Sequence, residues 1–236
     1  AHTITNLSVA TTYNVRVYAK NSIGRSTTSS PLEVTTAAAL ALAPSPPRVI
    51  SIGQTALSFE WDAPETDGGS PVTHYELELC LKDGSKRDEN WDENLKSTWT
   101  VRYAGPAPAA TIQNLPHGSE FYCRVRCING VGTSPASAST SVRTAPGPPE
   151  HPEGLRVLES TSSSVMLVWG ASAFDGGSPI THYNLWCARE PIIEEGDAFH
   201  LVLSGEGHAA EVTQLSSGTG YYWSVSAVNA YGSSRL

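Results

Sequence analysis

The sequence repeats itself at a spacing of 108 residues. "DGGSPVTHY" occupies residues 67–75 and "DGGSPITHY" occupies residues 175–183, so that eight of nine positions agree and 175 − 67 = 108. The same spacing aligns further residues: Leu7 with Leu115, Tyr13 with Phe121, Asn21 with Asn129, Trp61 with Trp169. A third copy of the later part follows at a shift of 100, with Leu215, Tyr221 and Asn229. Such self-similarity indicates a series of similar structural units.

Within each copy, apolar side chains recur at every second position. Residues 13–19, 121–127 and 221–227 alternate in this way, as does "TALSFEW" before the first repeated stretch. Alternation of period two is typical of strands with one buried face. No stretch has helical periodicity, and 20 glycines and 16 prolines supply many turns. The sequence therefore predicts an all-β fold of antiparallel β-sandwiches.

The order of these motifs resembles tandem fibronectin type III domains over essentially the whole chain. The residues that carry the resemblance are the opening prolines (Pro46, Pro47, Pro152), the tryptophans Trp61 and Trp169, the Gly-Gly-Ser-Pro loops leading to Tyr75 and Tyr183, and the segments "YAKNSIGRS", "RCINGVGTS" and "SAVNAYGSS". The resemblance implies immunoglobulin-like β-sandwiches arranged in tandem.

The alignment of the repeated copies divides the chain into three units. We expect residues 1–37 to be the C-terminal part of one domain, 44–145 to be a complete domain, and 146–236 to be a domain that lacks its last strand. The junctions from Val34 to Pro44 and from Val142 to Pro152 both span ten positions. Junctions of equal length predict similar head-to-tail offsets and a semi-extended rod.

The repeated nine-residue stretch is interpreted as a structural crossover between the two sheets. Its glycines permit positive φ, its aspartate can bond the turn backbone, and its proline fixes the entry to the next strand. Tyr75 and Tyr183 are expected to point into the core, with His74 and His182 on the opposite side. A single histidine per unit makes a poor metal site.

The leucine-to-tyrosine spacing predicts a tyrosine corner, in which a tyrosine hydroxyl bonds upstream backbone. Tyr13 and Tyr221 each follow a leucine by six residues, whereas Phe121 takes this place in the second copy. From the sequence, Phe121→Tyr is expected to add ~1 kcal/mol of stability.

Motifs for catalysis are missing from the sequence. It contains no nucleophile elbow and no ordered triad, and "GEGHAA" reads as a turn rather than a phosphate cradle. The acidic residues between Glu190 and Asp197 lack the spacing of a calcium loop, so a solvated hairpin is favoured over a calcium site. We expect no enzyme activity, no catalytic residue, no cofactor and no metal.

Cysteine positions favour thiols over disulfides. Cys123 and Cys127 lie four residues apart on one strand face, ~13 Å from each other, too far for a disulfide or a shared zinc ion. Cys187 should point inward and Cys80 outward. Unpaired thiols favour a reducing compartment, whereas the sequon at Asn6 would favour secretion.

A candidate binding segment is the charged stretch "KDGSKRDENWDEN" from Lys82 to Asn94. We expect a solvated loop or projecting hairpin there. Trp91 either folds back over its own sheet or anchors a partner protein, with Arg87 and Lys86 as a polar rim.

The favoured hypothesis is a non-enzymatic scaffold in the cytoplasm that spaces and docks proteins in a cytoskeletal assembly, either a filament or an axoneme. The Gly-Gly-Ser-Pro motif resembles that of type III domains in giant intracellular, titin-like filament proteins. Alternatives are an extracellular adhesion or receptor ectodomain and an accessory region of a larger enzyme. The net charge of −8 argues against nucleic acid, and no apolar run is long enough to enter a membrane.

Overall fold

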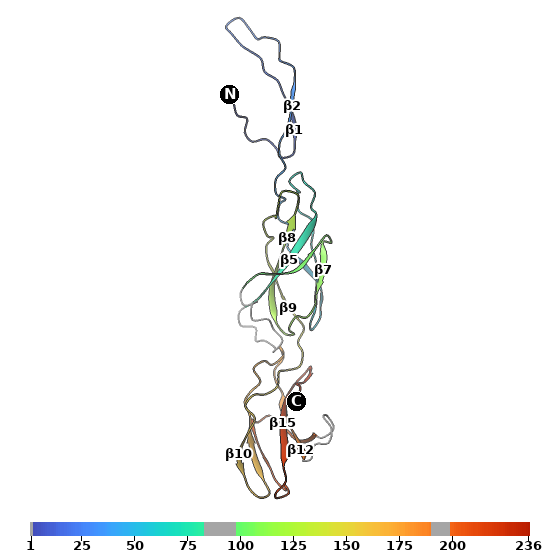
Figure 1. Cartoon of the computed structure of the whole chain (residues 1–236), viewed down its shortest axis with the longest axis vertical. Helices are drawn as coiled ribbons and strands as arrows, with labels where there is room; N and C mark the ends of the chain where they lie inside the picture. The colour runs from blue at the N-terminus through green and yellow to red at the C-terminus, as the bar shows by residue number, and fades with distance from the viewer. Residues whose placement is uncertain (1, 83–97, 190–198) are drawn as a thin grey trace.

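The computed structural model describes residues 2–82, 98–189 and 199–236. Every regular element in these ranges is a β-strand, and the strands form antiparallel sheets, which confirms the predicted all-β fold. An N-terminal hairpin and two sandwiches follow one another along the long axis (Figure 1). Among the described residues no helix is long and apolar enough to cross a membrane.

The N-terminal hairpin pairs two strands, β1 (Thr12–Val15) and β2 (Leu32–Thr35). The central sandwich packs one sheet of β3 (Arg48–Ile52), β4 (Leu57–Glu60) and β7 (Ala109–Ile112) against a second sheet. That second sheet has the order β6 (Thr100–Gly105), β5 (His74–Leu81), β8 (Glu120–Ile128) and β9 (Thr140–Arg143).

The C-terminal sandwich repeats this arrangement. Its first sheet holds β10 (Arg156–Ser160), β11 (Val165–Val168) and β14 (Ala209–Val212). Its second sheet holds, in order, β13 (His200–Gly205), β12 (His182–Arg189), β15 (Tyr221–Asn229) and β16 (Gly232–Ser233). The division of the chain at 1–37, 44–145 and 146–236 stays a prediction about independently folding units.

The core of the central sandwich lies between its two sheets, where the alternating residues meet. Phe59, Leu77 and Val125 are fully buried, and each such side chain stabilises the fold by about 1.5–3 kcal/mol. Trp61 packs edge-on against Tyr75, with the ring centroids 5.8 Å apart. Alternation along β8 therefore places one set of side chains in the core and leaves the other set on the outer face.

The repeated nine-residue stretch carries the chain from β4 to β5 and from β11 to β12, as the sequence predicts. Gly68 and Gly69 have φ values of 70° and 77°, and their counterparts Gly176 and Gly177 have 76° and 80°. Asp67 Oδ1 accepts a hydrogen bond of 2.8 Å from the Gly69 N–H, which holds the turn. The glycines are required here because side chains rarely adopt this backbone conformation.

Candidate interaction surface

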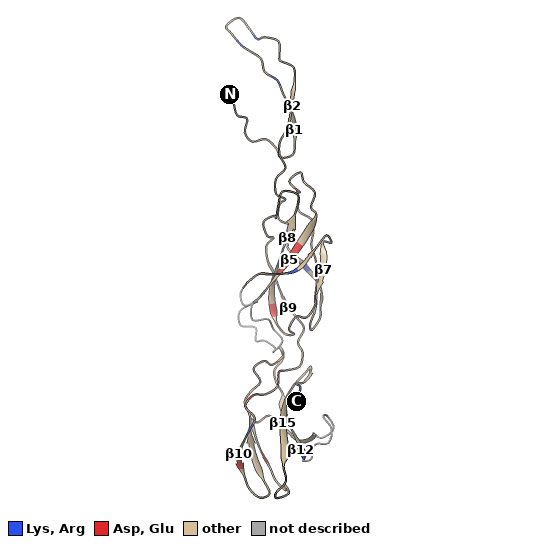
Figure 2. Cartoon of the chain, in the orientation of Figure 1, with Lys and Arg blue, Asp and Glu red and all other residues tan. Residues whose placement is uncertain are grey.

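The three predicted binding residues Trp91, Arg87 and Lys86 lie outside the described residues. Their segment connects β5 to β6 in the central sandwich. The two strands that flank it in the sequence belong to the β6-β5-β8-β9 sheet, whose outer face is called the central sheet face below. Figure 2 shows that acidic and basic residues lie next to one another on this part of the central sandwich.

A carboxylate between two arginines lies at the middle of the central sheet face. Glu78 on β5 is directly opposite Arg124 on β8 in the strand register. Its carboxylate accepts a hydrogen bond from Arg124 Nε and lies 3.5 Å from Arg126 Nε. The Glu78 side chain is only 12% exposed. The two arginine side chains are therefore held in place by a carboxylate that is mostly removed from water.

Trp99 extends this cluster toward β6. The Arg124 guanidinium lies over the Trp99 ring, 4.0 Å from its centroid, a geometry that gives a favourable cation–π interaction. Trp99 thus contacts a guanidinium that is itself fixed by Glu78. Tryptophan and arginine are enriched among the residues that dominate protein–protein binding. The cluster presents both of them in direct contact with each other.

A second charged cluster lies at the end of the same face. Glu120 Oε1 accepts hydrogen bonds from Lys82 Nζ at 2.9 Å and from Ser141 Oγ at 2.8 Å. Glu120 Oε2 lies 3.6 Å from Arg143 Nη2. The hydrogen bond from Lys82 lowers the pKa of Glu120 below its ordinary value. Glu120 thereby connects the ends of β5, β8 and β9 at Lys82, the residue with which the predicted binding segment begins.

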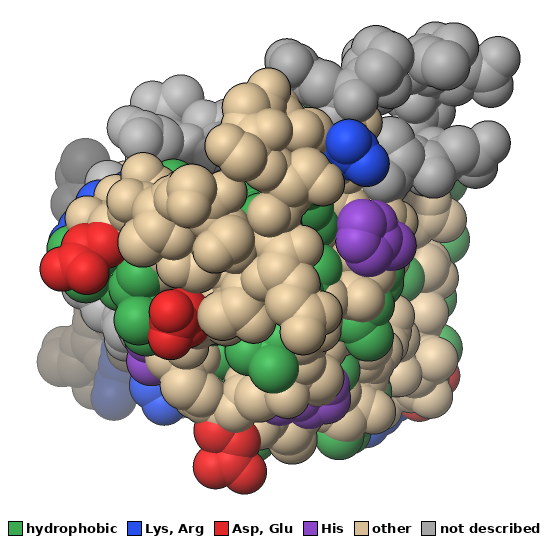
Figure 3. All heavy atoms as spheres, turned by 90° about the horizontal axis from the view of Figure 1, so that it is seen from below, with side chains coloured by type: hydrophobic (Ala, Val, Ile, Leu, Met, Phe, Trp, Pro, Cys, Tyr) green, Lys and Arg blue, Asp and Glu red, His purple; other side chains and the backbone are tan. Residues whose placement is uncertain are grey.

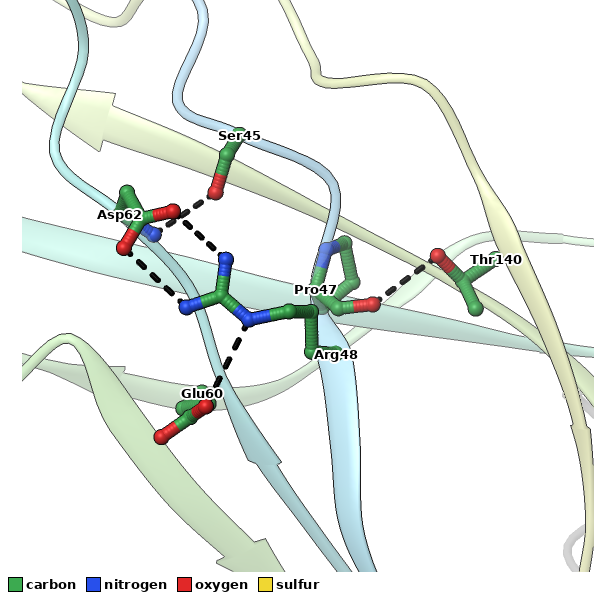
Figure 4. Close-up of polar contacts among 6 residues, drawn as sticks. All are labelled: Ser45, Pro47, Arg48, Glu60, Asp62 and Thr140. Carbon is green, nitrogen blue, oxygen red and sulfur yellow. Dashed lines mark hydrogen bonds and ion pairs between the residues drawn. The ribbon is translucent and has the colours of Figure 1, made fainter.

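A third cluster lies on the opposite sheet and has a structural role (Figure 4). Arg48 donates to both carboxylate oxygens of Asp62, at 2.6 and 3.1 Å, and to Glu60 at 3.4 Å. Ser45 Oγ accepts from the Asp62 N–H, and Thr140 Oγ1 donates to the Pro47 carbonyl. Arg48 lowers the pKa of Asp62. Because these charges are well exposed, the cluster contributes little stability, and it chiefly aligns the chain entering β3.

The C-terminal sandwich does not repeat the central sheet face. Asn184 and Trp186 take the places of Glu76 and Glu78, while Ser224 and Ser226 take those of the two arginines. Trp186 Nε1 donates to Ser226 Oγ at 3.0 Å. Seen from this end of the molecule, hydrophobic side chains lie scattered among polar ones (Figure 3). The charged cluster is therefore particular to the central sandwich.

The thiols offer no reactive site in the core. The structure contains no disulfide among its described residues, which include all four cysteines. Cys123 is fully buried and donates to the Thr140 carbonyl, and burial raises the pKa of this thiol to about 12. A thiol with such a high pKa is a poor nucleophile at neutral pH. No group of His, Cys, Asp or Glu in the described ranges is arranged to hold a metal ion.

Sequence reasoning missed the Glu78, Arg124 and Trp99 cluster. A usable signal was present, because "ELELC" and "CRVRC" place charges at every second position of two strands. Which strands are neighbours decides whether such charges meet, and that information is not contained in the alternation.

Comparison with known proteins agrees with this architecture. The family model "Fibronectin type III domain" matches residues 42–143 and 150–236. The chain belongs to the fibronectin type III family. Both sandwiches are fibronectin type III domains by this match, and the central sheet face lies on the first of them.

Relatives align with most of this fibronectin type III chain. "Fibronectin type-III domain-containing protein 3a" of Gallus gallus is 32% identical over 237 residues, covering 98% of this chain and 18% of that protein. "Titin" of Drosophila melanogaster is 31% identical over 192 residues, covering 78% of this chain and 1% of that protein. "Tyrosine-protein phosphatase Lar" of the same organism is 25% identical over 181 residues, covering 76% and 8%. The chain spans less than a fifth of the length of these relatives.

Proposed function

We propose that the chain is a non-enzymatic scaffold segment that spaces and docks other proteins in an intracellular cytoskeletal assembly, either a filament or an axoneme. The central sheet face carries this proposal. It combines Trp99 and Arg124 in a fixed geometry on one domain of a tandem series. Trp91, Arg87 and Lys86, which lie between β5 and β6 in the sequence, are proposed to belong to the same docking surface.

The thiols support the intracellular part of the proposal. Cys123, Cys127 and Cys187 are buried, and the chain has no disulfide among its described residues. Thiols persist in reducing compartments. Intact-mass analysis of the chain purified from cells and alkylated without reductant checks this point. Four alkylated cysteines after unfolding are expected, whereas an intramolecular disulfide would favour the extracellular alternative.

A second candidate is an accessory region of a larger enzyme. It is favoured by the relative whose name states a tyrosine-protein phosphatase, which aligns with 76% of this chain. The two candidates differ in whether the chain itself associates with the cytoskeleton.

The test is fractionation of cells that express the tagged chain. We expect the chain to remain with the detergent-insoluble cytoskeletal fraction, and Trp99→Ala with Arg124→Ala to release it. Leu201→Ala is the matched control, since Leu201 is 50% exposed on the C-terminal sandwich, and it should leave retention unchanged. Thermal melting of each variant shows whether it is folded. A chain that is fully soluble or secreted before any substitution contradicts the proposal.

A further inference from the structure

The repeated Asp-Gly-Gly loop contacts the linker that precedes its own sandwich. The Ala39 N–H donates to the Gly68 carbonyl at 2.9 Å, and the Gly147 N–H donates to the Gly176 carbonyl at 2.9 Å. The same loop position therefore binds the main chain of the linker at both junctions. These bonds are additional to the crossover role of the loop within its sandwich.

An asparagine at the end of the long central strand joins the same linker. Asn129 Nδ2 donates to the carbonyls of Ala39 and Asp67, both at 2.8 Å. Asn229 Nδ2 donates in the same way to Gly147 and Asp175, both at 2.8 Å. The two asparagines are 4% and 5% exposed. Each amide thus links the Asp-Gly-Gly loop to the linker in a buried position, where an unsatisfied carbonyl would be costly.

The loop also touches the preceding unit at a tight turn. A Cβ atom on Gly177 would lie 2.7 Å from Gly118 Cα, and one on Gly118 would lie 2.5 Å from the Gly176 carbonyl oxygen. At the first junction Ala10 stands in the place of Gly118, and a Cβ on Gly69 would lie 2.0 Å from the Ala10 methyl group. Small residues are therefore necessary on both sides of each contact.

The second junction has additional contacts from the residue before this turn. His117 Nε2 lies 2.8 Å from the Pro148 carbonyl oxygen, and its ring centroid is 5.5 Å from that of Phe174. Phe174, on the C-terminal sandwich, is 4% exposed. The Gly118 N–H donates to Ala145 in the linker at 3.0 Å. Side chains and backbone of both sandwiches thus enclose this linker.

We propose that these parts form a directional docking site between successive sandwiches. The tight turn at Gly118 and the linker after it make one half, and the Asp-Gly-Gly loop with the asparagine makes the other. The partner that fits is another fibronectin type III unit with a glycine or alanine in the turn. The site holds neighbouring sandwiches in one orientation. Domains joined only by small polar interfaces, by contrast, move independently of each other.

Two natural controls occur within the chain. Asn21 is equivalent to Asn129. Its Oδ1 accepts from the N–H groups of Ile23 and Gly24, as Asn129 Oδ1 accepts from those of Val131 and Gly132. Its Nδ2 has no linker partner among the described residues. Gly218 is equivalent to Gly118 and has a similar φ, 70° against 60°, but nothing lies within 4 Å of an added Cβ.

The test compares Gly118→Val with Gly218→Val, and Asn229→Ala with Asn21→Ala, in the full chain. Both glycines have positive φ, and both asparagines accept hydrogen bonds from the backbone that follows them. Only the first member of each pair also contacts a junction. Single-molecule energy transfer between dyes on the two sandwiches, attached at non-cysteine positions, gives the distribution of distances. We expect Gly118→Val and Asn229→Ala to broaden it about twofold or more, and both controls to match the unsubstituted chain.

Equal distributions within each pair would overturn the docking site, as would a broad distribution in the unsubstituted chain. If Gly118→Val unfolds the central sandwich, which tryptophan fluorescence reveals, the asparagine pair decides. The inference rests on the proposed spacing function for its biological use. Its readout is a property of the purified chain, so loss of cytoskeletal retention in cells would leave this result unaffected.

Discussion

The hydroxyl of Tyr221 accepts a hydrogen bond of 3.0 Å from the backbone N–H of Ser216. The N-terminal hairpin has the same bond, in which the Ser8 N–H donates to the Tyr13 hydroxyl at 2.8 Å. These are the two tyrosine corners that the leucine-to-tyrosine spacing predicts, and the structure confirms both. In the central sandwich the hydroxyl and its backbone donor are both missing, since Phe121 replaces the tyrosine and Pro116, which has no N–H, replaces the serine.

We predict that Phe121→Tyr alone destabilises the central sandwich, which corrects the expectation from sequence of a gain. Phe121 is 1% exposed, and a buried hydroxyl without a donor costs about 1–3 kcal/mol. The double variant Pro116→Ser with Phe121→Tyr should recover about 1 kcal/mol relative to Phe121→Tyr. Urea unfolding of the three proteins measures both steps. A single variant as stable as the parent would show that the hydroxyl finds another partner.

Removal of the Glu78 charge should reduce stability measurably. Glu78→Gln leaves Arg124 and Arg126 without their carboxylate in a site where Glu78 is 12% exposed, and the expected cost is about 1–3 kcal/mol. Asp62→Asn is the matched control, because the Asp62 side chain is 66% exposed and exposed ion pairs contribute little. Denaturant titration distinguishes the two. Equal effects would mean that burial of Glu78 does not strengthen its ion pairs.

Stability should fall at alkaline pH because of Cys123. Burial raises the pKa of this thiol from 9.0 to about 12, so above pH 9 the unfolded chain loses a proton that the folded chain keeps. The stabilisation is therefore fully present below about pH 9 and is lost as the pH rises toward 12. Between pH 8 and pH 10 the parent should lose about 1 kcal/mol more than Cys123→Val.

Urea unfolding at the two pH values measures this difference. Tyr75, whose pKa is also raised by burial, is present in both proteins, so the comparison isolates the thiol. An equal loss in both proteins would show that Cys123 ionises as easily in the folded chain as in the unfolded one.

Residues 44–145 should fold alone and be more stable than residues 146–236. In the central sandwich β9 pairs with β8, and Phe121 and Cys123 are almost fully buried. Their counterparts Tyr221 and Trp223 are only half-buried in the described C-terminal sandwich. Each incompletely buried side chain stabilises the fold by less than the roughly 1.5–3 kcal/mol that full burial contributes. Calorimetry of the two isolated pieces measures this, and equal melting temperatures would contradict the domain division.

Much of the sandwich interior could be predicted from sequence, because alternation determines which side of a strand faces the core. Val125 and Cys127 are buried as the pattern requires, and Tyr75 packs on Trp61. The cluster of Glu78, Arg124 and Trp99 could not be predicted, since it depends on strand order and on a register shift between Leu77 and Glu78.

The contact between Gly118 and Gly177 was also beyond sequence reasoning. These residues belong to different sandwiches, and their approach depends on how the units are placed relative to one another. The turn role predicted for Gly177 concerns its own loop alone and implies nothing about Gly118. The missing N–H of Pro116 is likewise uninformative by itself. It matters because Ser8 and Ser216, at the equivalent positions, donate to the tyrosines that are equivalent to Phe121.

The central sandwich carries both halves of the junction, with the Asp67–Gly69 loop and Asn129 at one end and the Gly118 turn at the other. Duplication of such a whole unit would therefore generate a longer chain without creating any new kind of interface. Gene segments that encode one repeat of about 108 residues could be gained or lost in evolution while every remaining neighbour keeps its geometry. An insertion inside the Gly-Gly loop, by contrast, would disrupt a fold and a junction at once.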